Sequence, residues 1–317
     1  SGTITQVIPP SLVLIVLGDQ LGRSVGDMYA GAIGVSVLQI LLFIAFIAGV
    51  SIFAPHKVPP LPDEALVARG WPLYWRVLKG MVPCIVLILV VLGTIFMGLA
   101  TPTEAGAMGT LGAVLLAVIN RRFTWALMRE AMGNTMRLTS MVIFILIGAT
   151  VFSLVFQGVD GSRWVEQLLS HLPGGQVGFL IFVNVFVFFL AFFLDFFEIA
   201  FIIIPLLAPV ATKLDIDLVW FGVLLCINLQ TSFMHPPFGF ALFYLRSIAP
   251  KSVLTKDIYL GAIPWLGLQL ILVAVVIFWP QSVTFFVNHD TGVDPASVTI
   301  ELPAAPQTDD DAVPVFR

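Results

Sequence analysis

Two adjacent prolines, Pro236 and Pro237, stand in the middle of an apolar stretch that covers roughly residues 216–248. This stretch is too long for one straight membrane span, which needs about 20 residues. A proline lacks a backbone N–H and clashes with the carbonyl four residues earlier, so two in succession break a helix. Inside a bilayer such a break survives only where it is buried in protein or lines a polar cavity. Broken helices of this kind hold ions and substrates in many secondary transporters.

A similar break occurs near the start of the chain, where Pro9 and Pro10 interrupt another apolar run. The residue four positions before each proline pair carries a hydroxyl group: Thr5 in the first copy and Ser232 in the second. Each copy therefore combines a freed backbone carbonyl with a side-chain oxygen on the same residue.

Each proline pair is followed by a related segment. Residues 27–39 and 257–269 share Asp, Tyr, Gly, Ala, Ile, Leu and Gln at matching positions. Apolar bias alone can produce the Leu and Ala matches, but Asp, Tyr and Gln at fixed offsets are harder to obtain by chance. The matches predict an internal duplication.

Composition places this duplication in a membrane. The chain has 59% hydrophobic and 11% charged residues and a mean hydropathy of +1.02, which excludes a soluble globular fold. Its apolar runs are continuous rather than alternating, which favours helices in a lipid bilayer over a β-barrel. The two cysteines lie far apart in apolar segments and indicate neither a disulfide nor a metal site. We therefore expect an all-α polytopic membrane protein.

Basic residues orient the chain. Of the 15 Lys and Arg residues, all but four lie in three alternate loops, at 55–80, 120–137 and 245–257. Such loops face the cytoplasm, so the intervening loops and the C-terminal tail are predicted to be periplasmic. Counting the crossings between residues 27–39 and 257–269 then gives opposite directions. The predicted architecture is an inverted-repeat transporter core with broken helices.

The predicted parts follow in chain order. They are the C-terminal part of the first repeat at 1–54, a cytoplasmic interfacial linker at 55–81, the second inverted repeat at 82–280, and an exposed polar tail at 281–317. Because the first repeat begins almost at its broken helix and without an initiator Met, we expect a truncation at the N-terminus.

A re-entrant hairpin is predicted at about 176–212, with Asp195 and Glu198 at its tip. The second arm, 199–212, is about 21 Å long at 1.5 Å per residue, shorter than a hydrocarbon core of about 30 Å. A bare carboxylate at that depth costs about 2.5–3.5 kcal/mol or more and needs a partner. The alternative is a wet loop between two ordinary spans. The surrounding phenylalanines and the lack of a basic residue favour the hairpin.

The polar groups around the two breaks are the candidate cation ligands. Carbonyl and hydroxyl oxygens suit a hard monovalent cation better than a transition metal. The predicted Na⁺ ligands are Thr5, Gln6, Asn228, Thr231, Ser232 and His235, and the residues that shape the breaks are Pro9, Pro10, Pro236, Pro237 and Gly239. Hydroxyl residues also pack ordinary membrane helices together. For His235 the pattern favours a hydrogen-bonded packing residue, and a proton carrier is the alternative.

The sequence contains no recognisable catalytic constellation and no phosphate-binding glycine loop. An intramembrane enzyme that uses His235 with Asp195 or Glu198 is one rival class. A structural or channel-forming subunit is another, although duplicated breaks argue against it. No cofactor other than a coupling ion, and no nucleic-acid partner, is expected.

Five motifs carry a resemblance to a known family. They are Gln-Val-Ile-Pro-Pro-Ser at 6–11, Gly-Leu-Ala-Thr-Pro-Thr-Glu-Ala-Gly at 98–106, Phe-Leu-Asp at 193–195, Asp-Ile-Asp-Leu-Val-Trp-Phe-Gly at 215–222 and Pro-Pro-Phe-Gly at 236–239. From residue 1 to about 283, the chain resembles the large membrane (permease) subunit of tripartite ATP-independent periplasmic (TRAP) transporters of the ion transporter superfamily.

The resemblance implies sodium-coupled uptake of an organic acid across a bacterial inner membrane by an elevator-like motion. It also implies a periplasmic substrate-binding protein that delivers the acid and a small four-helix membrane subunit. The sequence departs from the family pattern at His235, where many members carry Thr, and at Glu198, where many carry an apolar residue. A proton-coupled transporter of the same fold is therefore the alternative.

Overall fold

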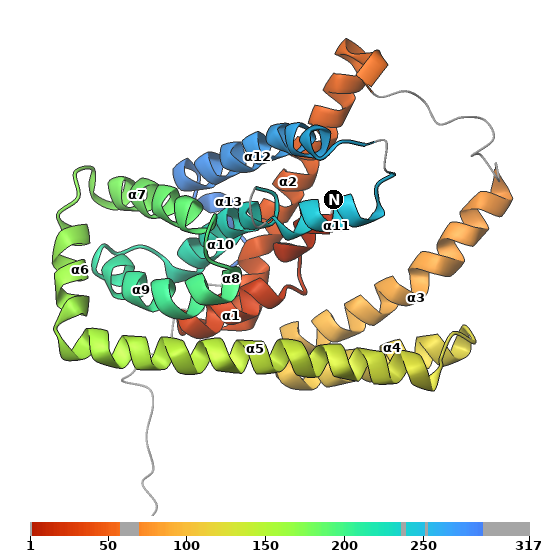
Figure 1. Cartoon of the computed structure of the whole chain (residues 1–317), viewed down its shortest axis with the longest axis horizontal. Coiled ribbons are helices and arrows are strands. Elements are labelled where there is room, and N and C mark those ends of the chain that lie inside the picture. Colours follow the sequence, from red (N-terminus) through yellow and green to blue (C-terminus); the bar gives the residue numbers. More distant parts are fainter. Residues whose placement is uncertain (1, 58–69, 236–238, 251–252, 288–317) are drawn as a thin grey trace, which may run out of the picture. The chain divides into compact units, whose positions relative to one another are not determined.

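The computed structural model describes residues 2–57, 70–235, 239–250 and 253–287, apart from the side chain of Phe240 (Figure 1). Residues up to Val287 form one compact unit. The described residues contain helices and no strand, which confirms the all-α prediction. The tail beyond Val287 and the predicted breakers Pro236 and Pro237 lie outside the described residues.

The described elements follow one another in chain order. They are η1 (Gly2–Gln6), α1 (Leu12–Gln20), α2 (Val25–Phe53), η2 (Pro55–Lys57), α3 (Trp71–Phe96), α4 (Pro102–Ile119), α5 (Trp125–Gly158), α6 (Gly161–Ser170), α7 (Gly175–Leu190), α8 (Phe196–Glu198), the π-helical turn η4 (Ile199–Ile203), α9 (Ile204–Lys213), α10 (Leu218–Leu229), η5 (Gln230–Phe233), α11 (Phe240–Ile248), α12 (Thr255–Phe278) and α13 (Gln281–Thr284).

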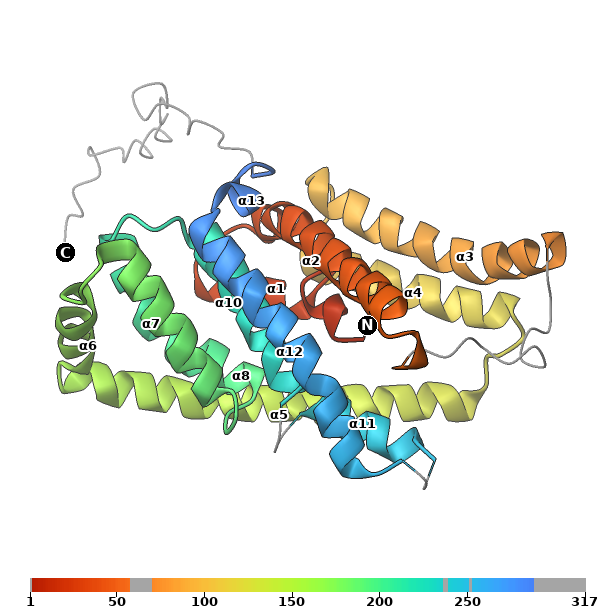
Figure 2. The same cartoon turned by 90° about the horizontal axis from the view of Figure 1, so that it is seen from above.

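Helix α10 is the centre of the core. All of its residues are buried, and it packs against α1, α2, α7 and α12, which surround it in Figures 1 and 2. A helix that is apolar on every side must be enclosed by protein or lipid. Its start is fixed by Asp217, whose carboxylate accepts a hydrogen bond from the Trp220 backbone N–H at 2.8 Å.

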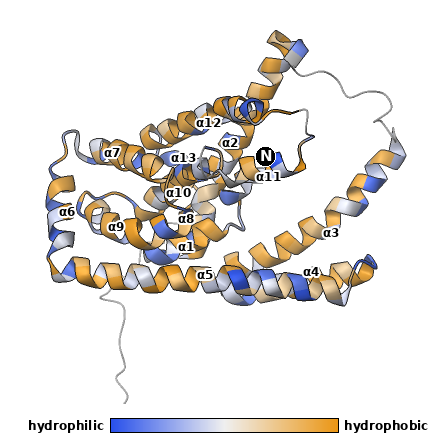
Figure 3. Ribbon diagram, viewed as in Figure 1, coloured by the Kyte–Doolittle hydropathy of each residue, from blue (hydrophilic) through white to orange (hydrophobic). Residues whose placement is uncertain are grey.

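Helices α3, α4 and α5 differ from α10 in how little of their surface is buried. Their apolar side chains are largely exposed, for example Leu89 and Phe144, and Figure 3 shows their hydrophobic colouring over most of each helix. Within the described residues, six helices are long and apolar enough to cross a membrane. Lipid or a partner subunit is the environment that such exposed surface requires, because water solvates it poorly.

At two places the sequence predicted a boundary between a basic segment and the membrane span after it, and the structure has one continuous helix there. Helix α3 begins at Trp71, whereas the sequence placed residues up to 81 in an interfacial linker; residues 58–69 of that linker are not described. The 26 residues of α3 span about 39 Å, longer than the hydrocarbon core, so its Trp-rich first turns reach the interface without a break. Likewise α5 is one helix of 34 residues that begins at Trp125, so it includes most of the basic segment 120–137 that the sequence placed in a loop.

The predicted hairpin region has two arms whose outer ends meet. The Gln176 side-chain amide at the start of α7 donates to the Leu214 carbonyl after α9, at 2.7 Å. The second arm begins at Phe196, so it has 18 residues rather than the 14 expected. It is therefore about 27 Å long, and the argument from shortness is weaker than the sequence indicated.

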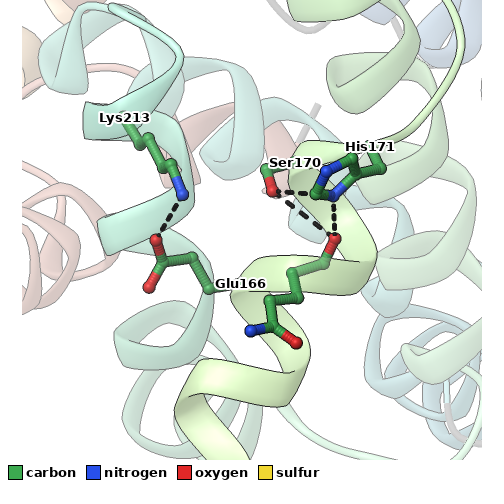
Figure 4. A network of polar contacts seen from close by, with 5 residues as sticks. Glu166, Ser170, His171 and Lys213 are labelled. Atoms are coloured by element: carbon green, nitrogen blue, oxygen red, sulfur yellow. Dashed lines mark hydrogen bonds and ion pairs between the residues drawn. The ribbon is translucent and has the colours of Figure 1, made fainter.

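Proline explains the π-helical turn within this arm. Pro205 cannot donate a hydrogen bond to the carbonyl four residues back, and the helix widens just before it. The Ile204 N–H bonds to Ile199 five residues back. The outer end of the arm is tied to α6 by an ion pair between Lys213 Nζ and Glu166 Oε1 at 2.7 Å (Figure 4).

Candidate functional site

The second break begins where α10 tightens into the 3₁₀ turn η5. The Thr231 hydroxyl donates to the Asn228 carbonyl and the Ser232 hydroxyl donates to the Leu229 carbonyl, both at 2.7 Å. Each hydroxyl hydrogen is thereby fixed toward the helix, which leaves the oxygen lone pairs facing away from it. Thr231 and Ser232 are both buried. Two of the predicted cation ligands therefore present oxygen atoms inside the core.

Gly239 begins the helix beyond the break. A Cβ atom at this position would lie 2.9 Å from the carbonyl oxygen of His235. Real side chains do not tolerate that contact, so the close return of the chain requires glycine here. The prediction that Gly239 shapes the break is consistent with this contact.

The first break lies between η1 and α1 and contains Pro9 and Pro10. Ser11 caps α1: its hydroxyl accepts from the Leu14 N–H at 3.3 Å and donates to the Gln6 carbonyl. The same Gln6 carbonyl also accepts a hydrogen bond from the Cys226 thiol of α10, at 3.2 Å from oxygen to sulfur. The backbone of Gln6 is therefore part of the core.

Thr5 is placed differently from its counterpart Ser232. Its side chain is exposed, and its hydroxyl donates to the Gly2 carbonyl at 2.7 Å. In this structure the Thr5 side chain therefore does not join the buried oxygens of the second break.

The two breaks touch each other. The Gln230 side-chain amide of η5 donates to the Thr3 carbonyl of η1 at 2.5 Å, and the Thr3 hydroxyl lies 3.7 Å from the Met234 sulfur. A largely apolar cavity of about 1060 Å³ opens beside this contact, between η1, η5, α11 and α12. Polar and irregular backbone from both ends of the chain is thus gathered in one place.

A buried cluster of three glutamines holds this junction. Gln39 Nε2 of α2 donates to Gln230 Oε1 at 3.0 Å and to Gln269 Oε1 of α12 at 2.8 Å. Gln269 Nε2 donates to Gln230 Oε1 and, at 3.2 Å, to the Ile227 carbonyl. All three glutamines are essentially inaccessible to solvent. The cluster fixes the first residue of η5 from two flanking helices.

Asp195 and Glu198 form a closed capping box at the start of α8. The Asp195 N–H donates to Glu198 Oε2 at 3.1 Å, and the Glu198 N–H donates to Asp195 Oδ1 at 3.0 Å. Each carboxylate thus satisfies a backbone donor at the helix N-terminus, where negative charge is favoured. Their local role is to turn the chain at the hairpin tip.

His235 packs on that tip. Its ring stacks on Phe192 with centroids 3.9 Å apart and planes 14° apart, and it meets Phe188 at 5.3 Å. The imidazole is buried, and neither ring nitrogen has a hydrogen-bond partner among the described residues. In particular, the ring contacts neither Asp195 nor Glu198 by a hydrogen bond, as the rival enzyme would require.

Besides Gln39 Oε1 of the glutamine cluster, two further buried oxygens lack partners in the described part of the chain: Asn184 Oδ1 of α7 and Asn228 Oδ1 of α10. The residues adjoin, because Asn228 Nδ2 donates to the Asn184 carbonyl at 2.7 Å. Sequence reasoning singled out Asn228 but missed Asn184, which looks like one polar residue in an apolar run. It used Gln39 and Gln269 only as marks of the duplication.

Comparison with known proteins decides the family. The family model of the tripartite ATP-independent periplasmic transporter DctM component matches residues 1–282. The chain belongs to this DctM family. The relatives of known name in this family are transporter permease proteins rather than enzymes. Six helices among the described residues are long and apolar enough to cross a membrane, which indicates a multi-pass membrane protein.

Individual relatives of this DctM-family chain are distant and longer. It is 25% identical over 301 residues to the C4-dicarboxylate TRAP transporter large permease protein DctM of Vibrio cholerae, with 88% of the chain and 64% of the relative covered. It is 28% identical over 284 residues to the sialic acid large permease protein SiaM of that organism, with 88% and 63% covered. The isethionate permease protein DctMQ of Oleidesulfovibrio alaskensis is 25% identical over 289 residues, with 90% and 44% covered. The chain thus spans less than two thirds of the length of these relatives.

Proposed function

We propose that this chain is part of the large membrane subunit of a sodium-coupled secondary transporter that imports an organic acid. The observation that carries the proposal is the meeting of two helix breaks, η1 and η5, in the core of a DctM-family protein. Relatives named for C4-dicarboxylates, sialic acid and isethionate all transport organic acids. A substrate of this class is therefore proposed here, without a choice among the three.

The chemistry of the second break supports a monovalent cation. Its donors are the buried oxygens of Thr231 and Ser232, with the Asn228 amide one turn earlier. Neutral oxygens suit Na⁺, whereas transition metals favour imidazole and thiolate ligands and Ca²⁺ sites usually contain carboxylates. Within the described residues no group of three His, Cys, Asp or Glu gathers.

The proposal also names the partner proteins of this chain and the membrane in which their complex would lie. A periplasmic binding protein would deliver the acid, and a small four-helix subunit would cover part of the exposed apolar surface of α3, α4 or α5. The complex would lie in the bacterial inner membrane, with the C-terminal tail in the periplasm. The hairpin tip at Asp195 and Glu198 would border the substrate.

Uptake by the full-length protein with its partner subunits in proteoliposomes tests this function. Thr231→Ala and Ser232→Ala each remove one oxygen without adding bulk. Loss of such a ligand is worth about 1–3 kcal/mol, or roughly ten- to hundredfold in apparent sodium affinity. Ser247→Ala is the matched control, because its hydroxyl makes the same bond to the carbonyl three residues back at 2.7 Å but is exposed on α11. Uptake that is independent of sodium would refute the coupling.

A second candidate, proton coupling, is favoured by the buried imidazole of His235, whose nitrogens have no hydrogen-bond partner in the part of the chain that the structure describes. Neutral histidine can accept a proton near physiological pH. Under this alternative, uptake follows an imposed proton gradient and depends on His235. Substitution of His235 therefore separates the two couplings.

A further inference from the structure

The side-chain amides of the glutamine cluster have only one arrangement. Two backbone carbonyls set it, because a carbonyl can only accept a hydrogen bond. Gln230 Nε2 therefore donates to the Thr3 carbonyl, and Gln269 Nε2 donates to Ile227. Both glutamines then turn Oε1 toward Gln39, which meets the two oxygens with Nε2 at 3.0 Å and 2.8 Å. Exchanging nitrogen and oxygen in any of the three amides would place acceptor against acceptor.

Gln230 is the member of the cluster that joins the two breaks. Its nitrogen bonds to Thr3 of η1 at 2.5 Å, and its oxygen accepts from Gln39 and Gln269 of the flanking helices. Gln230 is 1% exposed, and the other two glutamines are fully buried. Because water does not reach these amides, a partner that is lost is not replaced. Gln230 is therefore held in place by η1, α2 and α12 together.

The cluster holds the chain on both sides of the carbonyls that fix the Thr231 and Ser232 hydroxyls. Those carbonyls belong to residues 228–229. On one side, the Ile227 carbonyl accepts from the glutamine of α12 at 3.2 Å. On the other side, Gln230 begins η5 and is bonded at both ends of its amide. A change in the cluster therefore moves the backbone that presents the two hydroxyl oxygens.

We propose that Gln39 and Gln269 are positioning residues for transport, which act through Gln230 to hold the oxygens of η5 in the geometry that binds the coupling ion. This rests on the proposed sodium coupling and adds to it residues that do not bond to the η5 hydroxyls. Side chains that orient the ligands of an ion change its affinity without touching it. Each repeat supplies one of the two, since they occupy equivalent positions in the segments 27–39 and 257–269.

Sodium-dependent uptake by the full-length protein with its partner subunits in proteoliposomes tests this role. Methionine has nearly the volume of glutamine but no amide, so Gln39→Met, Gln269→Met and Gln230→Met remove the bonds without opening a large cavity. Each should raise the sodium concentration for half-maximal uptake on the order of tenfold. Adding Gln39→Met to Gln230→Met should cause no further rise, because the first residue acts through the second. A merely structural loss lowers the amount of active protein, and with it the maximal rate, but leaves this sodium midpoint unchanged.

Trp220→Phe is the matched control. Trp220 Nε1 donates to the Val276 carbonyl at 3.0 Å, so this substitution also removes a buried hydrogen bond between α10 and α12. The bond lies near the start of α10 rather than at η5. The control should lower the unfolding temperature without shifting the sodium midpoint.

The outcomes separate this role from the proposed function. A wild type whose uptake needs no sodium overturns both. Sodium-dependent uptake with an unchanged midpoint in Gln39→Met and Gln269→Met overturns the positioning role alone, and so does an equal midpoint shift in Trp220→Phe. If the methionine variants do not fold, Gln39→Asn decides. It keeps a buried amide but is one carbon shorter and does not reach both oxygens, so a raised midpoint supports the role and an unchanged one overturns it.

Discussion

Gln39 and Gln269 donate and accept one hydrogen bond, 2.8 Å from Nε2 to Oε1, across a separation of 230 residues. They occupy the same position in the two related segments 27–39 and 257–269. Thr3 and Gln230 also contact each other at an offset of 227 residues, the offset that relates Pro9 to Pro236. Residues can touch their own equivalents only near an axis that relates two repeats. These contacts support the predicted duplication, and its inverted direction stays a prediction.

The glutamine cluster is expected to stabilise this junction cooperatively. Gln39→Leu should destabilise the protein by about 1–3 kcal/mol, because it removes both donors to Gln230 and Gln269 from a buried site. Gln269→Leu should cost a similar amount. Since the two side chains share partners, the double variant should lose less than the sum of the single ones, with a coupling of about 0.5–3 kcal/mol. Denaturant unfolding measures this cycle, and exposed Gln157→Leu on α5 is the control. Additive losses would contradict a shared network.

The orientation predicted from basic residues can be checked along α5. Its 34 residues span about 51 Å without a break, so its two ends should reach opposite sides of a bilayer of about 30 Å. Single cysteines at Arg122 and Arg76 should react with impermeant reagent only from the cytoplasmic side, and one at Gly161 only from the periplasmic side. Labelling of Arg122 and Gly161 from the same side would contradict the inverted topology.

Sequence patterns predicted the all-α membrane class well. The all-α membrane fold follows from apolar runs, whose length and continuity leave few alternatives. The first break was visible because Pro9 and Pro10 are adjacent and together break a helix, whereas the single prolines Pro83 and Pro264 lie within the continuous helices α3 and α12. Helix boundaries were less predictable: a Trp- and Arg-rich segment before a span has the composition of an interfacial helix whether or not it is continuous with that span. In the structure the Trp-rich segment and the span after it form one continuous helix, α3.

The candidate site was predicted in part, because it depends on contacts between distant segments. Thr231 and Ser232 could be proposed from their distance to the prolines, but nothing in the sequence indicates that Thr5 turns toward Gly2 instead. Asn184 could not be distinguished from a packing residue until α10 was placed beside it. The sodium ligands remain predictions for these reasons.

The ion pair between Glu166 and Lys213 gives a pH-dependent prediction outside the membrane spans. The hydrogen bond and charge of Lys213 lower the pKa of Glu166 below its ordinary value of 4.5. A carboxylate with a lowered folded-state pKa contributes stability above its ordinary pKa and loses it as the pH falls through the lowered one. Glu166→Gln should therefore unfold slightly earlier than the wild type at pH 7, and the difference should vanish as the pH falls through the lowered pKa of Glu166. Because both side chains are largely exposed, high salt should also shrink it. A difference that grows in acid would contradict the ion pair.

His235 offers the sharpest separation of the two couplings. His235→Phe keeps an aromatic ring for stacking on Phe192 but removes the two buried nitrogens, which have no hydrogen-bond partner among the described residues. Each unpaired nitrogen costs about 1–3 kcal/mol, so the variant should be at least as stable as the wild type. If sodium is the coupling ion, His235→Phe alters substrate affinity and retains uptake driven by a sodium gradient. If His235 carries the proton, the variant loses all gradient-driven uptake although it is folded.

Uptake in proteoliposomes with imposed sodium or proton gradients shows which ion drives transport. Thermal unfolding of the same preparations shows that the variant is folded. His235→Gln, which restores one donor and one acceptor without titrating, should behave like His235→Phe in coupling. The control substitution is His171→Gln. His171 is exposed, and its ring forms a hydrogen bond with the Gln167 carbonyl of the preceding helix at 2.6 Å. We expect sodium-driven uptake in all four proteins. Uptake that follows the proton gradient in the wild type and in His171→Gln, and disappears in both His235 variants, would replace sodium by protons as the coupling ion.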